Sequence, residues 1–584
     1  MLDAKQLGVA ILIVVGLTAS CTGRAAHAPG RVLPHSYANV PAQWELLDRV
    51  REVRAPQAMV ASGHPIASEV GARVLRSGGN AVDAAVAVGF ALAVVYPRAG
   101  NIGGGGFMII RPSSGEVFAL DYREKAPGRA SADMFLDSAG RIAETSLIGH
   151  LAAGVPGTVA GLAEAHSRFG SLPFEQLIAP AIRLAREGFV VSDRMAAGIE
   201  SREEDLARFE ASRRQFLPGG HPPTPGTLFV QSDLAATLQL IADSGPSGFY
   251  TGRTADLIVA EMERGGGLIS HEDLATYRPA WRDPVTTTYR GYAVYSMPPA
   301  SSGGVTLAET LNILEGINPM PPLASTAGVH VLAEAMRRAF IDRNQYLGDP
   351  DFVGMPLDRL ISKSYATSLR ETIDPVRAST TPEFLPQLRE GGETTHYSIV
   401  DSRGNAVSVS TTINSLYGNK VTVSGAGFLL NNEMDDFTAA PGQPNQFGLI
   451  QGEANSIRPG KRMLSAMTPT IVLDREGNLK LLLGSPGGPR IITAVTQVIS
   501  NIVDHGMTLA EAIAAPRVHH QSLPDRIYYE GSGLRATTID ELRAMGHFVE
   551  QRDGSIGSVA AIIRDGANWV GVSDPRGTGS AVGY

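Results

Sequence analysis

The sequence contains a single cysteine, Cys21, among 584 residues. Disulfide bonds within the chain are therefore excluded, whatever the redox state of its compartment. The formal net charge is −8, and no long run of Lys or Arg occurs. Binding to nucleic acid needs clustered basic residues that neutralise phosphates, so we expect no nucleic-acid partner.

Signatures of metal and nucleotide sites are also missing. None of the 13 histidines stands in a His-Glu-x-x-His pattern, so no metal is expected. The glycine run at residues 103–106 lacks the Gly-Lys-Ser/Thr of a phosphate-binding loop, which favours close backbone packing. No cofactor is predicted. With 43% hydrophobic residues, the chain can bury a large core in one large domain or two intimate lobes.

A short apolar run near the amino terminus is typical of a targeting segment. Lys5 precedes the run at residues 7–17, and two small residues stand directly before Cys21. The run is shorter than the ~20 residues of a membrane-spanning helix. Cys21 resembles the lipidated cysteine of a bacterial lipoprotein signal; an ordinary secretory signal cleaved after Ala28 is the alternative. Either predicts a periplasmic or extracellular protein, and the first adds a lipid tether to the membrane.

Hydrophobic periodicity predicts a mixed α/β chain in which order begins near Met59. Two helices are expected at residues 67–76 and 81–95, the second buried all round and capped by Asn80. The other expected elements are strands at 107–110 and 117–120, a mainly helical stretch at 145–370, an exposed linker at 375–392, and helices near 497–503 and 509–514.

A β-hairpin is predicted from Thr394 to Thr412. Two alternating, β-branched runs flank a three-residue loop, 402–404, that ends in glycine. If Asp401 faces Asn405, then Thr394 faces Thr412. Directly opposed residues have Cβ atoms about 5 Å apart, so the two hydroxyl groups would be within hydrogen-bond reach. A slip of one residue would place them on opposite faces.

A threonine hydroxyl is a weak nucleophile unless a base lies beside it. A threonine at a free amino terminus carries its own base, because an α-amino group has a pKa of about 8. In the intact chain this nitrogen of Thr394 belongs to the peptide bond with Glu393, so cleavage of that bond would activate the residue. By itself, a Thr-Thr pair at a strand start is typical of plain β structure.

Several segments resemble the motifs of one known family. They are Gly78-Gly79-Asn80-Ala81-Val82-Asp83-Ala84-Ala85, residues 103–108, Arg123-Glu124, Thr394-Thr395-His396-Tyr397-Ser398, residues 430–437, residues 484–488 and Ser573-Asp574-Pro575-Arg576. In these segments the chain resembles bacterial γ-glutamyltransferases, which are members of the N-terminal nucleophile hydrolase superfamily. The likeness extends from about Met59 to Tyr584.

This resemblance implies an α/β (α+β) fold, a four-layer αββα sandwich built from both fragments of a self-cleaved precursor. Cleavage would fall between Glu393 and Thr394. The implied parts are a signal peptide at residues 1–20, a tether at 21–55, a large subunit at 56–393 and a small catalytic subunit at 394–584. The two subunits would stay together as a heterodimer.

The resemblance also implies an activity. Thr394 would attack the γ-carbonyl of glutathione or another γ-glutamyl compound, release the amine and form a γ-glutamyl ester. Water or an acceptor amino acid or peptide would then resolve the ester. Thr412 matches the family position that hydrogen-bonds the nucleophile. The backbone N–H groups of Gly487 and Gly488 would form the oxyanion hole.

Five further residues match the family's substrate contacts. Arg123 would pair with the donor's α-carboxylate, a bidentate role that suits a guanidinium, and Ser465 would donate to the same carboxylate. Asp436 would bind the α-ammonium, assisted by Asn414 and Glu433. Taken singly, such residues are also typical of surface ion pairs and turns.

Two positions depart from the family pattern. The stretch Leu464-Ser465-Ala466-Met467 has alanine where a second serine is common, so one hydroxyl is missing near the donor carboxylate. Losing a hydrogen bond to a charged group costs about 1.5–3 kcal/mol when nothing replaces it. The family's lid loop corresponds to residues 438–452, where Phe447 can pack but cannot donate a hydrogen bond.

Two other functions stay open at this point. A cephalosporin or glutaryl amide acylase of the same superfamily would keep Thr394 but would not need an ammonium site at Asp436. An unprocessed lipoprotein that only binds γ-glutamyl peptides would keep an intact chain. The combination of Arg123 and Asp436 favours γ-glutamyl transfer and hydrolysis.

Overall fold

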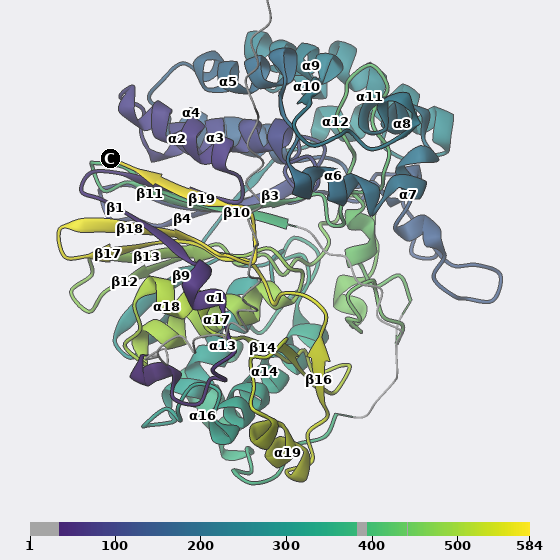
Figure 1. Cartoon of the computed structure of the whole chain (residues 1–584). Helices are drawn as coiled ribbons and strands as arrows, with labels where there is room; N and C mark the ends of the chain where they lie inside the picture. Colours follow the sequence, from purple (N-terminus) through teal and green to yellow (C-terminus); the bar gives the residue numbers. More distant parts are fainter. Residues whose placement is uncertain (1–33, 382–393, 441) are drawn as a thin grey trace, which may run out of the picture.

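The computed structural model describes residues 34–381, 394–440 and 442–584. Two seven-stranded antiparallel sheets pack against each other, and helices cover their outer faces (Figure 1). This confirms the expected mixed α/β architecture. None of the helices in the described part of the chain is both long and apolar enough to cross a membrane. Cys21 and Glu393 lie outside the described residues.

Each sheet contains strands from both sides of residue 394. The first sheet has the order β19 (Ser580–Gly583), β2 (Met59–Ser62), β10 (Thr394–Val400), β11 (Ala406–Thr412), β3 (Gly105–Arg111), β4 (Phe118–Tyr122), β7 (Ala280–Arg282). The second has the order β1 (Arg51–Ala55), β18 (Asn568–Ser573), β17 (Ala560–Asp565), β13 (Leu479–Gly484), β12 (Thr470–Leu473), β9 (Tyr292–Ser296), β8 (Val285–Tyr289).

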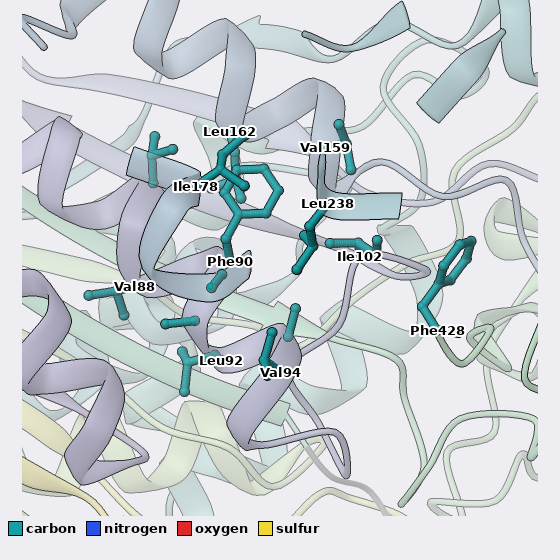
Figure 2. Close-up of a cluster of buried hydrophobic side chains, with 14 of the residues drawn as sticks. Val88, Phe90, Leu92, Val94, Ile102, Val159, Leu162, Ile178, Leu238 and Phe428 are labelled. Carbon is teal, nitrogen blue, oxygen red and sulfur yellow. The ribbon is translucent and has the colours of Figure 1, made fainter. Parts of the chain in front are cut away.

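The outer face of the first sheet is covered by the two helices predicted near the amino terminus, α2 (Pro65–Arg76) and α3 (Ala81–Val95). Every residue of α3 is buried, and Asn80 and Asp83 form a capping box at its start. Figure 2 shows Phe90 of α3 beside side chains of α4 (Thr158–Phe169), α5 (Phe174–Glu187) and α9 (Ser232–Ser244). The predicted buried helix is thus confirmed.

Helices α13 (Gly303–Glu315), α17 (Arg490–Val503) and α18 (Leu509–Ala514) lie beyond the second sheet (Figure 1). The last two confirm the helices predicted in this region. The remaining longer helices are α6 (Asp193–Glu200), α11 (Gly252–Gly265), α14 (Thr326–Tyr346), α16 (Lys363–Glu371) and α19 (Ala536–Ala544). A small sheet joins β14 (Val518–His519), β15 (Ile527–Glu530) and β16 (Val549–Arg552).

One expectation is wrong: order begins before Met59, because Tyr37 and Trp44 are buried and β1 pairs with β18. The stretch 145–370 is mainly helical, as predicted, and it also supplies strands β7, β8 and β9. Strands β8 and β9 form a hairpin whose turn residues, Arg290 and Gly291, both have positive φ.

His396 lies between the two large sheets. Its ring nitrogens hydrogen-bond Ser410 (2.9 Å) and Ser398 (3.1 Å). A Cβ atom on Gly484 of the facing sheet would lie 2.3 Å from this ring, so glycine makes room for the imidazole. Burial lowers the pKa of His396 to about 3. Burial also lowers the pKa of His547 to about 4.

We expect acid to destabilise the fold through these imidazoles. The unfolded chain protonates them as the pH falls through their ordinary pKa of ~6.5, whereas the folded chain keeps them neutral, so stability is full above that pH and falls below it. The thermal midpoint should drop between pH 7 and pH 5, and His396→Asn should reduce that drop. His221→Asn, at an exposed position, is the matched control. An equal drop in wild type and His396→Asn would refute the role of His396.

Candidate active site

Thr394 begins β10 and is 6% exposed. It pairs with Thr412 of β11 in the predicted register. Its hydroxyl donates to Oγ1 of Thr412 over 3.3 Å, which confirms the predicted hydroxyl contact. Oγ1 of Thr412 also accepts the N–H of Asn414 (2.8 Å). Backbone pairing therefore fixes both hydroxyl groups at the end of the central hairpin.

The predicted residues converge on one cavity beside Thr394. Its free space is only about 20 Å³, because charged side chains and Phe447 fill it. The predicted residues that line it are Arg123, Thr394, Thr412, Asn414, Glu433, Asp436, Ser465 and Gly488, together with Ala466. We call this space the charged cavity.

A buried guanidinium sits among carboxylates in the charged cavity. Arg123 is 1% exposed and donates to Oδ2 of Asp436. Its Nη1 lies 2.8 Å from Oε2 of Glu433, without the alignment of a hydrogen bond, and 3.5 Å from Glu124. Burial opposes the charge of Arg123, but these carboxylates raise its pKa above the ordinary value. Arg123 is therefore firmly cationic.

Burial has the opposite effect on the acids around Arg123. It raises the pKa of Glu124 to about 7 and raises the pKa of Glu433 and Asp436, while the guanidinium counteracts it. Both carboxylate oxygens of Glu433 lack an aligned hydrogen-bond donor among the described residues. Such buried acceptors favour a ligand with a cationic N–H group.

The short 3₁₀-helix η5 (Glu433–Asp436) presents these acids. The backbone carbonyl of Asp436 accepts from Gln451 (3.1 Å) and Asn455 (2.7 Å). The side-chain amide of Asn414 lies 3.5 Å from Oδ1 of Asp436 and donates to the carbonyl of Asn432 (3.0 Å). The acids are thus held in place by the backbone and amides around them.

Gly487 and Gly488 form a turn with positive φ at both residues, 131° and 58°. Neither N–H group donates a hydrogen bond to any other described residue. Two adjacent, unengaged donors beside the cavities that Thr394 lines would suit the oxyanion of a tetrahedral intermediate. Gly488 lines the charged cavity, whereas Gly487 and Thr394 line a second cavity.

Phe447 closes the charged cavity. A Cβ atom on Gly488 would lie 2.8 Å from its ring. Its carbonyl accepts from the side chain of Gln521 (2.9 Å), and the side chain of the preceding Gln446 accepts from Ser415 (2.7 Å). Hydrogen bonds of Gln446 and Phe447 therefore hold the described part of the loop 438–452 over the charged cavity.

Sequence reasoning missed Arg343 of α14. This residue lines the charged cavity, is 1% exposed and donates to Gln451 (2.9 Å) and Ser302 (3.0 Å). Ser302 in turn donates to the carbonyl of Ser465 (2.6 Å). Burial lowers the pKa of Arg343 to about 10, so it remains charged at neutral pH. The available signal was an arginine inside a helix that is otherwise largely buried.

One group of metal-ligand type occurs among the described residues: His330, Glu334 and His547, whose ligand atoms lie within 4.8 Å of one another. Glu334 already pairs with Arg338 (2.6 Å) and approaches Arg337 (3.4 Å). Two guanidinium groups offset the carboxylate charge that would attract a cation. None of the three residues lines either cavity at Thr394.

Comparison with known proteins points to one family. A profile described as Gamma-glutamyltranspeptidase matches residues 67–584. The chain is 45% identical over 572 residues to the glutathione hydrolase proenzyme of Escherichia coli (strain K12), covering 97% of each chain. It is 48% identical over 553 residues to the glutathione hydrolase proenzyme of Pseudomonas sp. (strain A14), covering 91% of this chain and 95% of the relative.

The structure is similar to the crystal structure of cephalosporin acylase from Bacillus halodurans, with a TM-score of 0.81 and 28% identity. The match covers 91% of this chain and 97% of the acylase.

Proposed function

The chain belongs to the γ-glutamyltranspeptidase family, and from that premise we propose that it is a self-processing γ-glutamyltransferase and glutathione hydrolase. The observation that carries the proposal is the buried pair of Arg123 and Asp436 in the cavity that Thr394 lines. An α-amino acid head group has one carboxylate and one ammonium. The pair offers one opposite charge for each.

We propose that the donor binds by exchange. Its α-carboxylate takes the place of Asp436 on Arg123, with Ser465 as a further donor. Its α-ammonium then pairs with the released Asp436 carboxylate and with Glu433, whose oxygens lack aligned donors, while Asn414 adds a polar contact. Because each charge of the ligand meets an opposite charge, no unpaired ion remains buried.

The proposed chemistry begins with cleavage between Glu393 and Thr394, which frees the α-amino group of Thr394. That amine accepts the hydroxyl proton as Oγ1 attacks the γ-carbonyl. The N–H groups of Gly487 and Gly488 hold the oxyanion. The amine half leaves with the proton, and a γ-glutamyl ester of Thr394 remains. Water or an acceptor amino acid or peptide then attacks the ester and regenerates the hydroxyl.

The proposal includes the arrangement of layers and subunits in the processed protein. The two sheets and their helices would be the four-layer αββα sandwich of an N-terminal nucleophile hydrolase, with the subunits 56–393 and 394–584 held together as a heterodimer. The packed segment at residues 34–55 belongs to this body. No cofactor or metal enters the proposed chemistry.

We further propose a location outside the cytoplasm. The support is the sequence alone: the charged start, the apolar run at residues 7–17 and the small residues before Cys21. A lipid on Cys21 would tether the mature protein to a membrane, whereas cleavage after Ala28 would release it.

A cephalosporin or glutaryl amide acylase is the second candidate, favoured by the similarity to the Bacillus halodurans acylase. The Arg123–Asp436 pair argues against it, because a glutaryl group has no ammonium to replace the guanidinium at Asp436. A protein that only binds γ-glutamyl peptides would not need the unengaged donors at Gly487 and Gly488.

Thr394→Ala should abolish both cleavage and catalysis, because both steps use the same hydroxyl. We expect one full-length band on a denaturing gel and no release of p-nitroaniline from γ-glutamyl-p-nitroanilide, whereas wild type gives two bands and product. Thr394→Ser, which keeps a hydroxyl, is the matched control and should be cleaved and active. An active but uncleaved Thr394→Ala protein would contradict the proposal.

Asp436→Asn should lower kcat/KM for γ-glutamyl-p-nitroanilide by about 10- to 100-fold, since a hydrogen bond to a charged group is worth ~1.5–3 kcal/mol. Glutaryl-p-nitroanilide differs only by lacking the ammonium, so its kcat/KM should fall much less. Parallel assays of the two anilides measure this difference. Equal losses on both would exclude Asp436 as the ammonium site.

Ala466→Ser should strengthen donor binding. Ala466 lines the charged cavity next to Ser465, so a serine would place a second hydroxyl near the donor's α-carboxylate. We expect KM for γ-glutamyl-p-nitroanilide to fall about tenfold, at the lower end of ~1.5–3 kcal/mol for a charged hydrogen bond. Ser465→Ala is the companion variant and should raise KM. A higher KM in Ala466→Ser would show that the cavity cannot accommodate the hydroxyl.

A further inference from the structure

Arg343, near the end of α14, is a buried cation that has no ion pair with any described residue. Its side chain lines the charged cavity and is 1% exposed. The hydrogen bonds of its guanidinium go to neutral groups, namely Ser302 (3.0 Å), Gln451 (2.9 Å) and Asn344 (2.8 Å). Burial of an unpaired ion is costly. A cation that the fold retains at this position is therefore a candidate for a role beyond stability.

One chain of hydrogen bonds joins Arg343 to Ser465. Nε of Arg343 donates to the hydroxyl of Ser302 (3.0 Å). The hydroxyl and the backbone N–H of Ser302 both donate to the carbonyl of Ser465 (2.6 and 2.8 Å). The hydroxyl of Ser465 accepts from the N–H of Met467 (3.1 Å) and donates to no other described residue. This chain, the Ser302 arm, therefore holds a residue whose O–H is free for the donor's α-carboxylate.

A second chain of hydrogen bonds joins Arg343 to Asp436. Nη1 of Arg343 donates to the side-chain carbonyl of Gln451 (2.9 Å), and the amide of Gln451 donates to the backbone carbonyl of Asp436 (3.1 Å). Burial raises the pKa of Asp436, and the charges of Arg123 and Arg343 counteract that rise. This chain, the Gln451 arm, therefore holds the carboxylate that is proposed to receive the α-ammonium.

The two arms meet at one rigid group. A guanidinium keeps its N–H donors in a single plane, so Ser302 and Gln451 are held at a fixed separation. The residues at the far ends of the arms come from different structures: Asp436 belongs to η5, whereas Ser465 forms a β-bridge with Ser301. The carboxylate and the ammonium of an α-amino acid are bonded to the same carbon atom. Their protein partners must therefore keep a precise spacing, since a displacement of about 1 Å can cost a large part of the binding or the rate.

We infer that Arg343 is a positioning residue of the donor site: through Ser302 and Gln451 it holds Ser465 and Asp436 at the spacing that an α-amino acid head group requires. The inference rests on the proposed function, which assigns the head group to the charged cavity. Arg343 acts through its two arms and does not have to touch the donor. Loss of Arg343 weakens binding of the head group more than it slows the reaction at the γ-carbonyl, which lies at the other end of the glutamyl chain.

Arg343→Gln removes both the charge and the planar group that joins the arms. We expect KM for γ-glutamyl-p-nitroanilide to rise about tenfold or more, the factor that a hydrogen bond to a charged group contributes. The value of kcat should change much less, and a denaturing gel should still show two bands. Arg343→Lys keeps the charge without the planar group, so it should recover only part of the loss.

Arg338→Gln is the matched control. Arg338 is another arginine of α14, is 8% exposed and lines neither cavity at Thr394. Its replacement should lower the thermal midpoint, because Arg338 is paired with Glu334 (2.6 Å), and should leave KM at the wild-type value. An equal rise of KM in Arg338→Gln would overturn the inference, since it would show a general effect of disturbing α14.

Double variants test whether the two arms act through Arg343. Ser302→Ala cuts the first arm and Gln451→Leu cuts the second, and each should raise KM by a smaller factor than Arg343→Gln. Combining either with Arg343→Gln should add little to the effect of Arg343→Gln alone, because residues that act as one unit are not additive. Effects that multiply in full would overturn the inference, as would an unchanged KM in Arg343→Gln.

The single-arm variants also decide the case in which Arg343→Gln does not fold. An unchanged KM in both Ser302→Ala and Gln451→Leu would then overturn the inference, whereas a higher KM with nearly constant kcat in each would support it. No cleavage of γ-glutamyl-p-nitroanilide by wild type would instead overturn the proposed function, and the inference with it.

Discussion

Strand pairing across residue 394 is the constraint on which the site depends. Strand β10 is hydrogen-bonded to β2 on one side and to β11 on the other, and β11 pairs with β3. Strands β2 and β3 precede the proposed cut, whereas β10 and β11 follow it. The second sheet is interleaved in the same way through β1 and β18 and through β9 and β12. Cleavage of the peptide bond before Thr394 would therefore leave Thr394 held in the sheet by β2 and β11.

The same sheet sets the distance between Thr394 and the buried charges. Arg123 directly follows β4, which pairs with β3, so its backbone is two strands from that of Thr412. Opposing acids come from η5, after a loop whose Asn414 has a φ of 72°. Buried ions cost several kcal/mol each unless they are paired. The fold thus keeps this cluster of paired charges in the cavity that Thr394 lines.

Local patterns predicted local structure well. The loop 402–404 fixed the register of Thr394 and Thr412, and Asn80 marked the start of α3, because both signals are contained in a few consecutive residues. The hairpin of β8 and β9 carried a similar signal at Arg290-Gly291 but stood inside a helical region and was missed. Arg343 could not be found this way. Its partners Gln451 and Ser302 are distant in sequence, and only tertiary packing brings them together.

The pair of Arg123 and Asp436 resembles the head group of an amino acid with its charges reversed. In the proposed binding mode each partner occupies the place of one ligand charge, and folding has already removed both ions from water. Any free α-amino acid of suitable length meets the same complementary charges as the donor. Glutamate, the product of hydrolysis, keeps both head-group charges of the donor and has lost only the amine half. In the proposed binding mode, product and substrate would therefore compete for the Arg123–Asp436 pair, and accumulated glutamate would slow the reaction.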